Sequence, residues 1–168
     1  MRLHIGGEEI KEGWKILNIQ NKPGVDFIGD ITDLSKFLDQ SVEEVYASHV
    51  LEHVGINLVE KAIKEIFRIL KPGGIFYVSV PDLEVLAKLF LAESDGGNKI
   101  NLMKMIYGAQ TDKHDFHYVG FWRDILFAWI KIAGFTSYEK VNYFNIFNDT
   151  SSLQVRGVPI SLNVVAIK

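Results

Sequence analysis

The chain has 168 residues and a formal net charge of −3, with 18 basic and 21 acidic side chains and no cysteine. This length predicts a single domain, residues 1–168, with its own hydrophobic core. The absence of a basic run argues against a nucleic-acid partner, and no apolar run approaches the ~20 residues that a membrane span needs. Without cysteine there is no disulfide and no cysteine-held metal. Because residues 1–9 contain no apolar signal core, we expect a cytoplasmic protein.

The first two predicted strands, Arg2–Ile5 and Lys15–Ile19, lie very close together in the sequence. Gly6 and Gly7 follow the first strand, where glycines let a ligand approach the backbone, although a Gly-Gly pair alone is more typical of a plain turn. Only residues 8–14 remain for the connection, whereas a full crossover needs about ten to twelve residues. The first crossover helix should therefore be vestigial.

A vestigial helix leaves one face of the sheet without its usual cover. Monomers seldom expose apolar surface of that kind. We expect Trp14, the aromatic segment 143–159 or a second copy of the chain to cover the face, and we therefore predict a homodimer.

Residues 43–82 give the clearest pattern in the chain. Val45–Ser48 is a short apolar strand, and residues 57–70 repeat apolar side chains every three or four positions, which predicts an amphipathic helix. Asn57 is the expected N-cap, and Pro72 with the following Gly-Gly is expected to end the helix. Ile75–Val80 is almost continuously apolar, as in a strand that is covered on both faces.

A strand, a helix and a second strand of this kind form a right-handed parallel βαβ unit. Ligands of such sheets bind beyond the carboxyl ends of the strands. Here those ends are Ser48-His49 and Pro81-Asp82, so the functional groups should lie there. The remaining predicted elements are a third strand at Asp26–Ile31, a short helical segment at Leu34–Leu38, helices at Leu83–Leu91, Ile100–Tyr107 and Phe121–Ala133, and strands at Thr136–Val141 and Ser161–Ile167.

Three stretches, ASHVLEHV, EIFRILKPGG and FYVSVPDLE, occur in an order and spacing that carry a family resemblance. They resemble the second half of the class I S-adenosylmethionine (SAM) dependent methyltransferases, closest to a short group of predicted SAM-dependent methyltransferases. The resemblance implies an α/β fold with a Rossmann-like, mostly parallel sheet and an antiparallel last strand. It also implies SAM as the cofactor and places these residues at its site: Gly6, Gly7, Gln20, Asp30, Ile31, Ser48 and His49.

The implied roles at this site differ, and two positions depart from the family pattern. Gly6 and Gly7 correspond to the SAM-binding loop, Asp30 to the acceptor for the adenine amino group, and the Ile31 amide to a contact with the ring. Glu8 stands where a further glycine is common, and Gln20 replaces the acid that binds the ribose. Because hydrogen bonds to charged groups are stronger than those to neutral groups, we expect weak SAM binding.

The expected reaction is methyl transfer to a small-molecule acceptor. Histidine suits a general base at neutral pH, and the resemblance favours His117, in the stretch DFHYVGF, as the catalytic residue. The sequence has no Asn-Pro-Pro-Tyr signature of amino-group methylation, which favours an oxygen acceptor.

Two alternatives stay open. A methyltransferase-like scaffold with a decayed cofactor site would explain Glu8 and Gln20. Residues 49–53 also fit the H-x-x-E-H motif of inverted zinc peptidases, in which two histidines on one helix hold zinc. Because His49 follows a buried strand, the context favours the methyltransferase, and we assign no metal ligands from the sequence.

Overall fold

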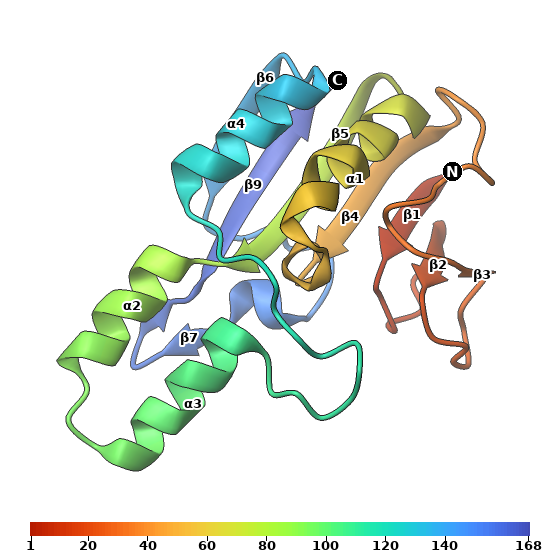
Figure 1. Cartoon of the computed structure of the whole chain (residues 1–168). Coiled ribbons are helices and arrows are strands. Elements are labelled where there is room, and N and C mark those ends of the chain that lie inside the picture. Colours follow the sequence, from red (N-terminus) through yellow and green to blue (C-terminus); the bar gives the residue numbers. More distant parts are fainter.

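The computed structural model describes all 168 residues and has an α/β architecture (Figure 1). The helices are α1 (Ile56–Ile69), α2 (Leu83–Ala92), α3 (Gly96–Tyr107) and α4 (Arg123–Ala133), with 3-10 turns at Leu51–His53 and Thr150–Ser152. The strands are β1 (Arg2–Ile5), β2 (Trp14–Asn18), β3 (Phe27–Ile28), β4 (Val42–Ser48), β5 (Leu70–Pro81), β6 (Ser137–Val141), β7 (Gln154–Val155), β8 (Val158–Pro159) and β9 (Ser161–Ile167). No helix has the length and apolar character to cross a membrane.

Seven strands form one sheet in the order β3-β2-β1-β4-β5-β9-β6. β9 pairs antiparallel with both β5 and β6, and the other pairs are parallel. This confirms the predicted mostly parallel sheet with an antiparallel last strand. The direction of winding reverses between β1 and β4, which is the place where open parallel sheets bind ligands.

The alternation of side chains along the strands divides the sheet into two faces. Val45 and Ala47 of β4 belong to the main core, whereas Tyr46 between them belongs to a separate aromatic cluster on the other face. α1 and α4 cover the first face, where the buried side chains of α1 include Ile63 and Ile66 (Figure 1).

The second face lacks its first crossover helix, as predicted, because residues 6–13 connect β1 to β2 without one. The segment that precedes β7 takes the place of that helix. Phe147 lies 5.2 Å from Trp14 and 4.9 Å from Tyr46 between ring centroids. Asn163 of β9 fixes this segment, since its Nδ2 donates to the carbonyls of Asn142 and Ser151, each at 2.9 Å. The chain therefore covers this face itself.

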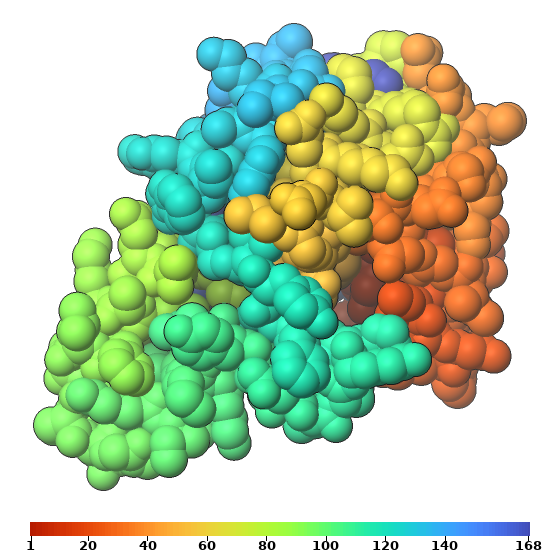
Figure 2. Space-filling view, viewed as in Figure 1, coloured from red at the N-terminus to blue at the C-terminus, as the bar shows by residue number.

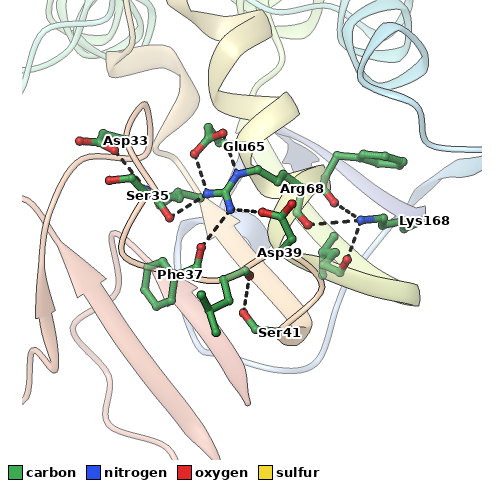
Figure 3. A network of polar contacts seen from close by, with 12 residues as sticks. Asp33, Ser35, Phe37, Asp39, Ser41, Glu65, Arg68 and Lys168 are labelled. Carbon is green, nitrogen blue, oxygen red and sulfur yellow. Dashed lines mark hydrogen bonds and ion pairs between the residues drawn. The ribbon is translucent and has the colours of Figure 1, made fainter.

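Residues 29–41 contain turns but no helix, so the short helix expected at Leu34–Leu38 does not form. Arg68 of α1 holds this segment in place (Figure 3). Its guanidinium donates to both carboxylate oxygens of Glu65, to Asp39 Oδ1, and to the carbonyls of Phe37 and Leu34, at 2.7–2.9 Å. All five N–H donors of Arg68 are thus used. These contacts to α1, and not hydrogen bonds within a helix, hold the segment in place.

The two ends of α1 differ from the prediction. Gly55, not Asn57, is the N-cap, and no side chain caps the helix there. The helix ends at Ile69, before Pro72, because Leu70 turns to an extended conformation and pairs with Val42 of β4. Lys168 Nζ donates to the carbonyls of Phe67 and Leu70 at 2.5 and 2.7 Å, so a basic side chain binds carbonyls at the helix terminus.

α2 and α3 form a hairpin that projects from the sheet (Figure 1). Asp82 is the N-cap of α2 and accepts from the Val85 amide at 3.2 Å. The loop from Gly108 to Trp122 returns from α3 to α4. In Figure 2 it lies against the N-terminal part of the chain, with a hollow between them beside α1.

Candidate functional site

A cavity of about 370 Å³ lies beyond the carboxyl ends of β1, β2 and β4, at the point where the strand order reverses. This size is within the range of small-molecule sites. Its lining combines apolar side chains with charged and polar ones. The lining residues are Ile5, Gly6, Glu8, Leu17, Asn18, Ile19, Gln20, Lys22, Gly29, Asp30, Ile31, His49, Val50, His53, Val54, Lys113, His114 and Tyr118.

Five of the seven cofactor residues expected from the sequence line this cavity: Gly6, Gln20, Asp30, Ile31 and His49. Gly7 and Ser48 do not. A Cβ on Gly7 would lie 2.3 Å from the His4 ring, so this glycine allows close packing on His4. The hydroxyl of Ser48 is buried and has no hydrogen-bond partner.

The position of Gly6 requires a glycine. Its φ is +76°, a conformation that residues with a Cβ rarely adopt. A Cβ there would also lie 2.5 Å from a methyl group of Val50. Gly6 donates its amide to the Leu17 carbonyl at 2.8 Å, so the loop after β1 is tied to β2 at the floor of the cavity.

Asn18, which the sequence interpretation missed, joins the two loops that should hold the cofactor. Its Nδ2 donates to the Gly7 carbonyl at 3.1 Å, and its Oδ1 accepts from the Gln20 amide at 2.9 Å. The carboxamide of Gln20 has no partner within the chain and can bind a ligand. A polar residue directly after the apolar pair Ile16-Leu17 was the sequence signal for Asn18.

Asp30 and Ile31 present complementary polar groups at the side of the cavity. Asp30 Oδ1 accepts from the amide and hydroxyl of Thr32, each at 2.8 Å, which fixes the carboxylate and leaves Oδ2 without a partner in the chain. The Ile31 amide makes no hydrogen bond within the chain. One free acceptor next to one free donor is the pattern that an adenine edge requires.

Glu8 does not stand alone at the mouth of the cavity. It pairs with Lys22, a second residue missed at the sequence level. Both side chains are substantially exposed, so the pair contributes little to stability. Lys22 nevertheless offsets the negative charge of Glu8.

His49 occupies a strained position at the end of β4. Its φ is +54°, which is uncommon for a non-glycine residue and often marks a functional site. Ser161 Oγ donates to the Thr150 carbonyl at 2.9 Å, so it accepts the hydrogen bond that His49 Nε2 donates at 2.9 Å. His49 Nδ1 lies 3.2 Å from Glu52 Oε1, and the two form an ion pair when His49 is protonated.

A second cavity of about 260 Å³ adjoins the first, because His49 and His53 line both. The expected base, His117, lines this second cavity and not the first. The other lining residues come mainly from the α3–α4 connection and the segment before β9: Glu52, Pro81, Lys104, Met105, Gly108, Ala109, Asp115, Thr150, Leu153 and Ile160.

Burial and charge act on the pKa values of this second site. Burial alone would raise the pKa of Glu52, but the adjacent imidazoles of His49 and His53 hold it below its usual range. Burial lowers the pKa of His117, against the opposing charge of Glu52. One carboxylate oxygen of Glu52 and one ring nitrogen each of His53 and His117 all lie within 4.8 Å of one another, close enough to surround a metal ion.

The helical zinc-peptidase motif is not formed. His49 is the residue directly after β4. Glu52 and His53 lie in a short 3-10 turn, Leu51–His53. The two histidines therefore do not lie one turn apart on an α-helix, as that motif requires.

Comparison with known proteins identifies the fold. The family model described as a methyltransferase domain matches residues 8–78. The chain has the class I methyltransferase fold. No curated protein matches the sequence significantly.

Solved structures of this methyltransferase fold cover nearly the whole chain. A SAM-dependent methyltransferase of Thermotoga maritima, described as a possible histamine N-methyltransferase, is 18% identical over 99% of this chain and 81% of its own, with a TM-score of 0.63. A SAM-dependent methyltransferase of Archaeoglobus fulgidus is 13% identical over 99% and 85%, with a TM-score of 0.63. The Burkholderia thailandensis 1,6-didemethyltoxoflavin-N1-methyltransferase, solved with that compound and S-adenosylhomocysteine, is 15% identical over 99% and 70%, with a TM-score of 0.60.

Proposed function

We propose that the chain is a SAM-dependent methyltransferase that acts on a small-molecule acceptor, at an oxygen atom. The methyltransferase fold and the matching domain model indicate SAM as the cofactor. The observation that carries the proposal is the convergence of Gly6, Gln20, Asp30, Ile31 and His49 on one cavity at the sheet's switch point.

The groups in this cavity fit the chemistry of SAM. The free Asp30 oxygen and Ile31 amide match the adenine edge, the Gln20 carboxamide can bind ribose hydroxyls, and apolar side chains such as Leu17 can pack against the ring. Lys22 can attract the carboxylate of the methionine part, although Glu8 competes for it.

The second cavity is the proposed place of the acceptor. It opens beside the first, and His49 and His53 lie between them. When bound, SAM supplies a methyl group activated by its sulfonium. The chain's own residues hold the acceptor in line and keep water out, which are the main contributions that a protein makes to such a displacement. His117 is the side chain that we assign to the acceptor oxygen.

Calorimetric titration with SAM and S-adenosylhomocysteine tests this assignment. We expect the wild type to bind both, Asp30→Asn to weaken binding roughly tenfold or more because a charged hydrogen bond is lost, and His117→Ala to leave it unchanged. If the wild type does not bind at millimolar SAM, the scaffold alternative is favoured instead.

Once an acceptor is found, His117→Ala should lower turnover by about 10²–10⁴, the usual contribution of a residue that handles a proton in the transition state. The homodimer and the cytoplasmic location expected from the sequence stay predictions.

A further inference from the structure

The Glu52 carboxylate is buried, and within the chain its only ion-pair partner is His49. Its side chain is fully inaccessible to solvent, and neither of its oxygens makes a hydrogen bond in the chain. The contact with His49 Nδ1 at 3.2 Å meets an ion-pair distance but lacks hydrogen-bond geometry. Buried charges are normally paired, hydrogen-bonded or bound to a metal.

Two imidazoles face this carboxylate with free ring nitrogens. His53 Nδ1 lies 3.1 Å from the Phe116 carbonyl and must donate to it, which leaves Nε2 unprotonated in the neutral ring. A backbone carbonyl on the second nitrogen is the usual support of a metal-binding histidine. His117 Nδ1 is buried and has no hydrogen-bond partner.

Backbone hydrogen bonds hold the two segments that carry these groups. The Tyr118 amide donates to the Glu52 carbonyl at 2.7 Å, and the His117 amide donates to the Tyr107 carbonyl at 3.1 Å. The loop between α3 and α4 is therefore attached to the 3-10 turn at the position where the three side chains meet. Backbone hydrogen bonds therefore keep Glu52, His53 and His117 close together in the folded chain.

We propose that Glu52, His53 and His117 bind one divalent transition-metal ion, for which Zn²⁺ is the best match. The ligand atoms lie within 4.8 Å of one another. Atoms bound to one tetrahedral Zn²⁺ are roughly 3.3–3.5 Å apart, so small side-chain rotations complete the site. Two imidazoles and one carboxylate suit Zn²⁺ and related ions, whereas Mg²⁺ and Ca²⁺ prefer oxygen ligands alone.

Three protein ligands leave a coordination position open, as in catalytic zinc sites. His53 lines both cavities and His117 lines the second, so that position lies on the acceptor side. This role rests on the proposed function. A metal-bound acceptor hydroxyl loses its proton to water more easily. The oxygen's electron pair then forms the new O–C bond as the methyl's C–S bond breaks. With the metal bound, His117 acts on the acceptor oxygen through the ion, and the loss of turnover expected for His117→Ala then follows from loss of the metal.

Metal binding is tested by calorimetric Zn²⁺ titration of the full chain after treatment with a chelator, without SAM. We expect one Zn²⁺ per chain. Loss of an outer partner of a metal site already weakens binding about 10- to 100-fold, so Glu52→Gln and His117→Ala should weaken it by more than about 100-fold. His114→Ala, which removes a histidine from the same loop but not from the cluster, should leave Zn²⁺ binding unchanged.

Bound Co²⁺ gives a second readout, since its visible absorption reports nitrogen and oxygen ligands directly. The absorption should appear in the wild type and in His114→Ala and be lost in His117→Ala, while melting in chelator shows whether each variant folds. The ring centroids of His53 and His117 lie 4.8 Å apart, edge to face, so the Co²⁺ spectrum also separates metal ligation from packing of the two rings. No Zn²⁺ binding by the wild type, or equal losses in His114→Ala and His117→Ala, would overturn the proposal. SAM binding in chelator tests the proposed function separately.

Discussion

At the scale of single residues, Gln20 should set how tightly the chain holds SAM. Its amide is engaged with Asn18, and its carboxamide is free at the cavity wall. A neutral carboxamide can bind ribose hydroxyls, but hydrogen bonds to a charged group contribute about 1.5–3 kcal/mol against about 1 kcal/mol for neutral ones. We therefore expect a dissociation constant of SAM on the order of tens of micromolar or above.

Gln20→Asp should tighten SAM binding by roughly three- to thirty-fold, because it restores a charged acceptor for the ribose. Calorimetric titration of the wild type and the variant measures this change. Gln40→Asp adds the same charge on an exposed loop outside both cavities and should have no effect. Weaker binding by Gln20→Asp would mean that the ribose lies elsewhere.

The sequence could indicate the residues at strand ends but not the side chains that connect them. His49 was found because the carboxyl ends of parallel strands carry ligand sites, whereas Gly6 and Gln20 were placed by the family resemblance. Lys22 was missed because its partner, Glu8, is 14 positions away and only the fold brings the two together. Glu52 was weighed as a motif residue, and its burial without a partner depends on the packing of the α3–α4 loop.

At the scale of elements, Arg68 connects α1 to the segment that carries part of the cofactor cavity. The side chain of Arg68 is partly exposed. Its guanidinium nevertheless fixes residues 34–39, just after Asp30 and Ile31 (Figure 3). A helix that is polar on one face can therefore hold a loop that has no regular structure of its own.

Arg68→Lys should destabilise the chain by about 2–3 kcal/mol, since an ammonium group cannot make the five planar contacts of a guanidinium. Urea unfolding measures the loss, and SAM titration should show weaker binding because the segment next to Asp30 loosens. Arg123→Lys is the matched control. Arg123 is exposed and pairs only with its neighbour Asp124. The free energy of unfolding of Arg123→Lys should therefore lie within about 0.5 kcal/mol of the wild type. Equal losses of stability in the two variants would show that the contacts of Arg68 contribute no more than those of Arg123.

Elements with strong periodicity were predictable, and their ends were not. The apolar period placed α1 within one residue at each end, yet the cap proved to be Gly55 and the stop came before Pro72. The end of α1 is decided by the pairing of Leu70 with Val42, a contact between residues 28 positions apart that no local signal reports. The same holds for residues 34–38, whose conformation is fixed by Arg68.

At the scale of the whole molecule, the chain covers the face that suggested a homodimer. Phe147 and its neighbours lie over Trp14 and Tyr46, so a homodimer would have to use another surface. Phe147→Ala should uncover part of this face, lower stability by about 3 kcal/mol and increase self-association in light scattering. Phe116→Ala, which removes a more exposed ring of the α3–α4 loop, is the control. The same apparent mass for both variants would show that the face stays covered.

The aromatic cover also encloses a titratable group. His4 is 5% exposed, its ring centroid lies 4.0 Å from that of Phe147, and its Nδ1 has no hydrogen-bond partner. Burial lowers the pKa of His4 from 6.5 to about 4, although the negative charges of Asp149 and Glu9 act in the opposite direction. The folded chain therefore keeps His4 neutral at a pH at which the unfolded chain protonates it.

This difference makes stability depend on pH in a defined window. Between pH 6.5 and about 4 the unfolded state binds the additional proton, so the free energy of unfolding falls as the pH is lowered through this range. We expect a loss of about 2 kcal/mol between pH 7 and pH 5 from His4 alone. His4→Leu removes the titrating group and keeps an apolar side chain under Phe147, so its stability should fall less over the same interval. Urea unfolding at both pH values gives the change in the free energy of unfolding for each protein. Subtracting the change in His4→Leu from that in the wild type cancels the contributions of the other four histidines. Equal pH dependence in wild type and His4→Leu would mean that water reaches His4 and that the segment over the sheet opens in solution.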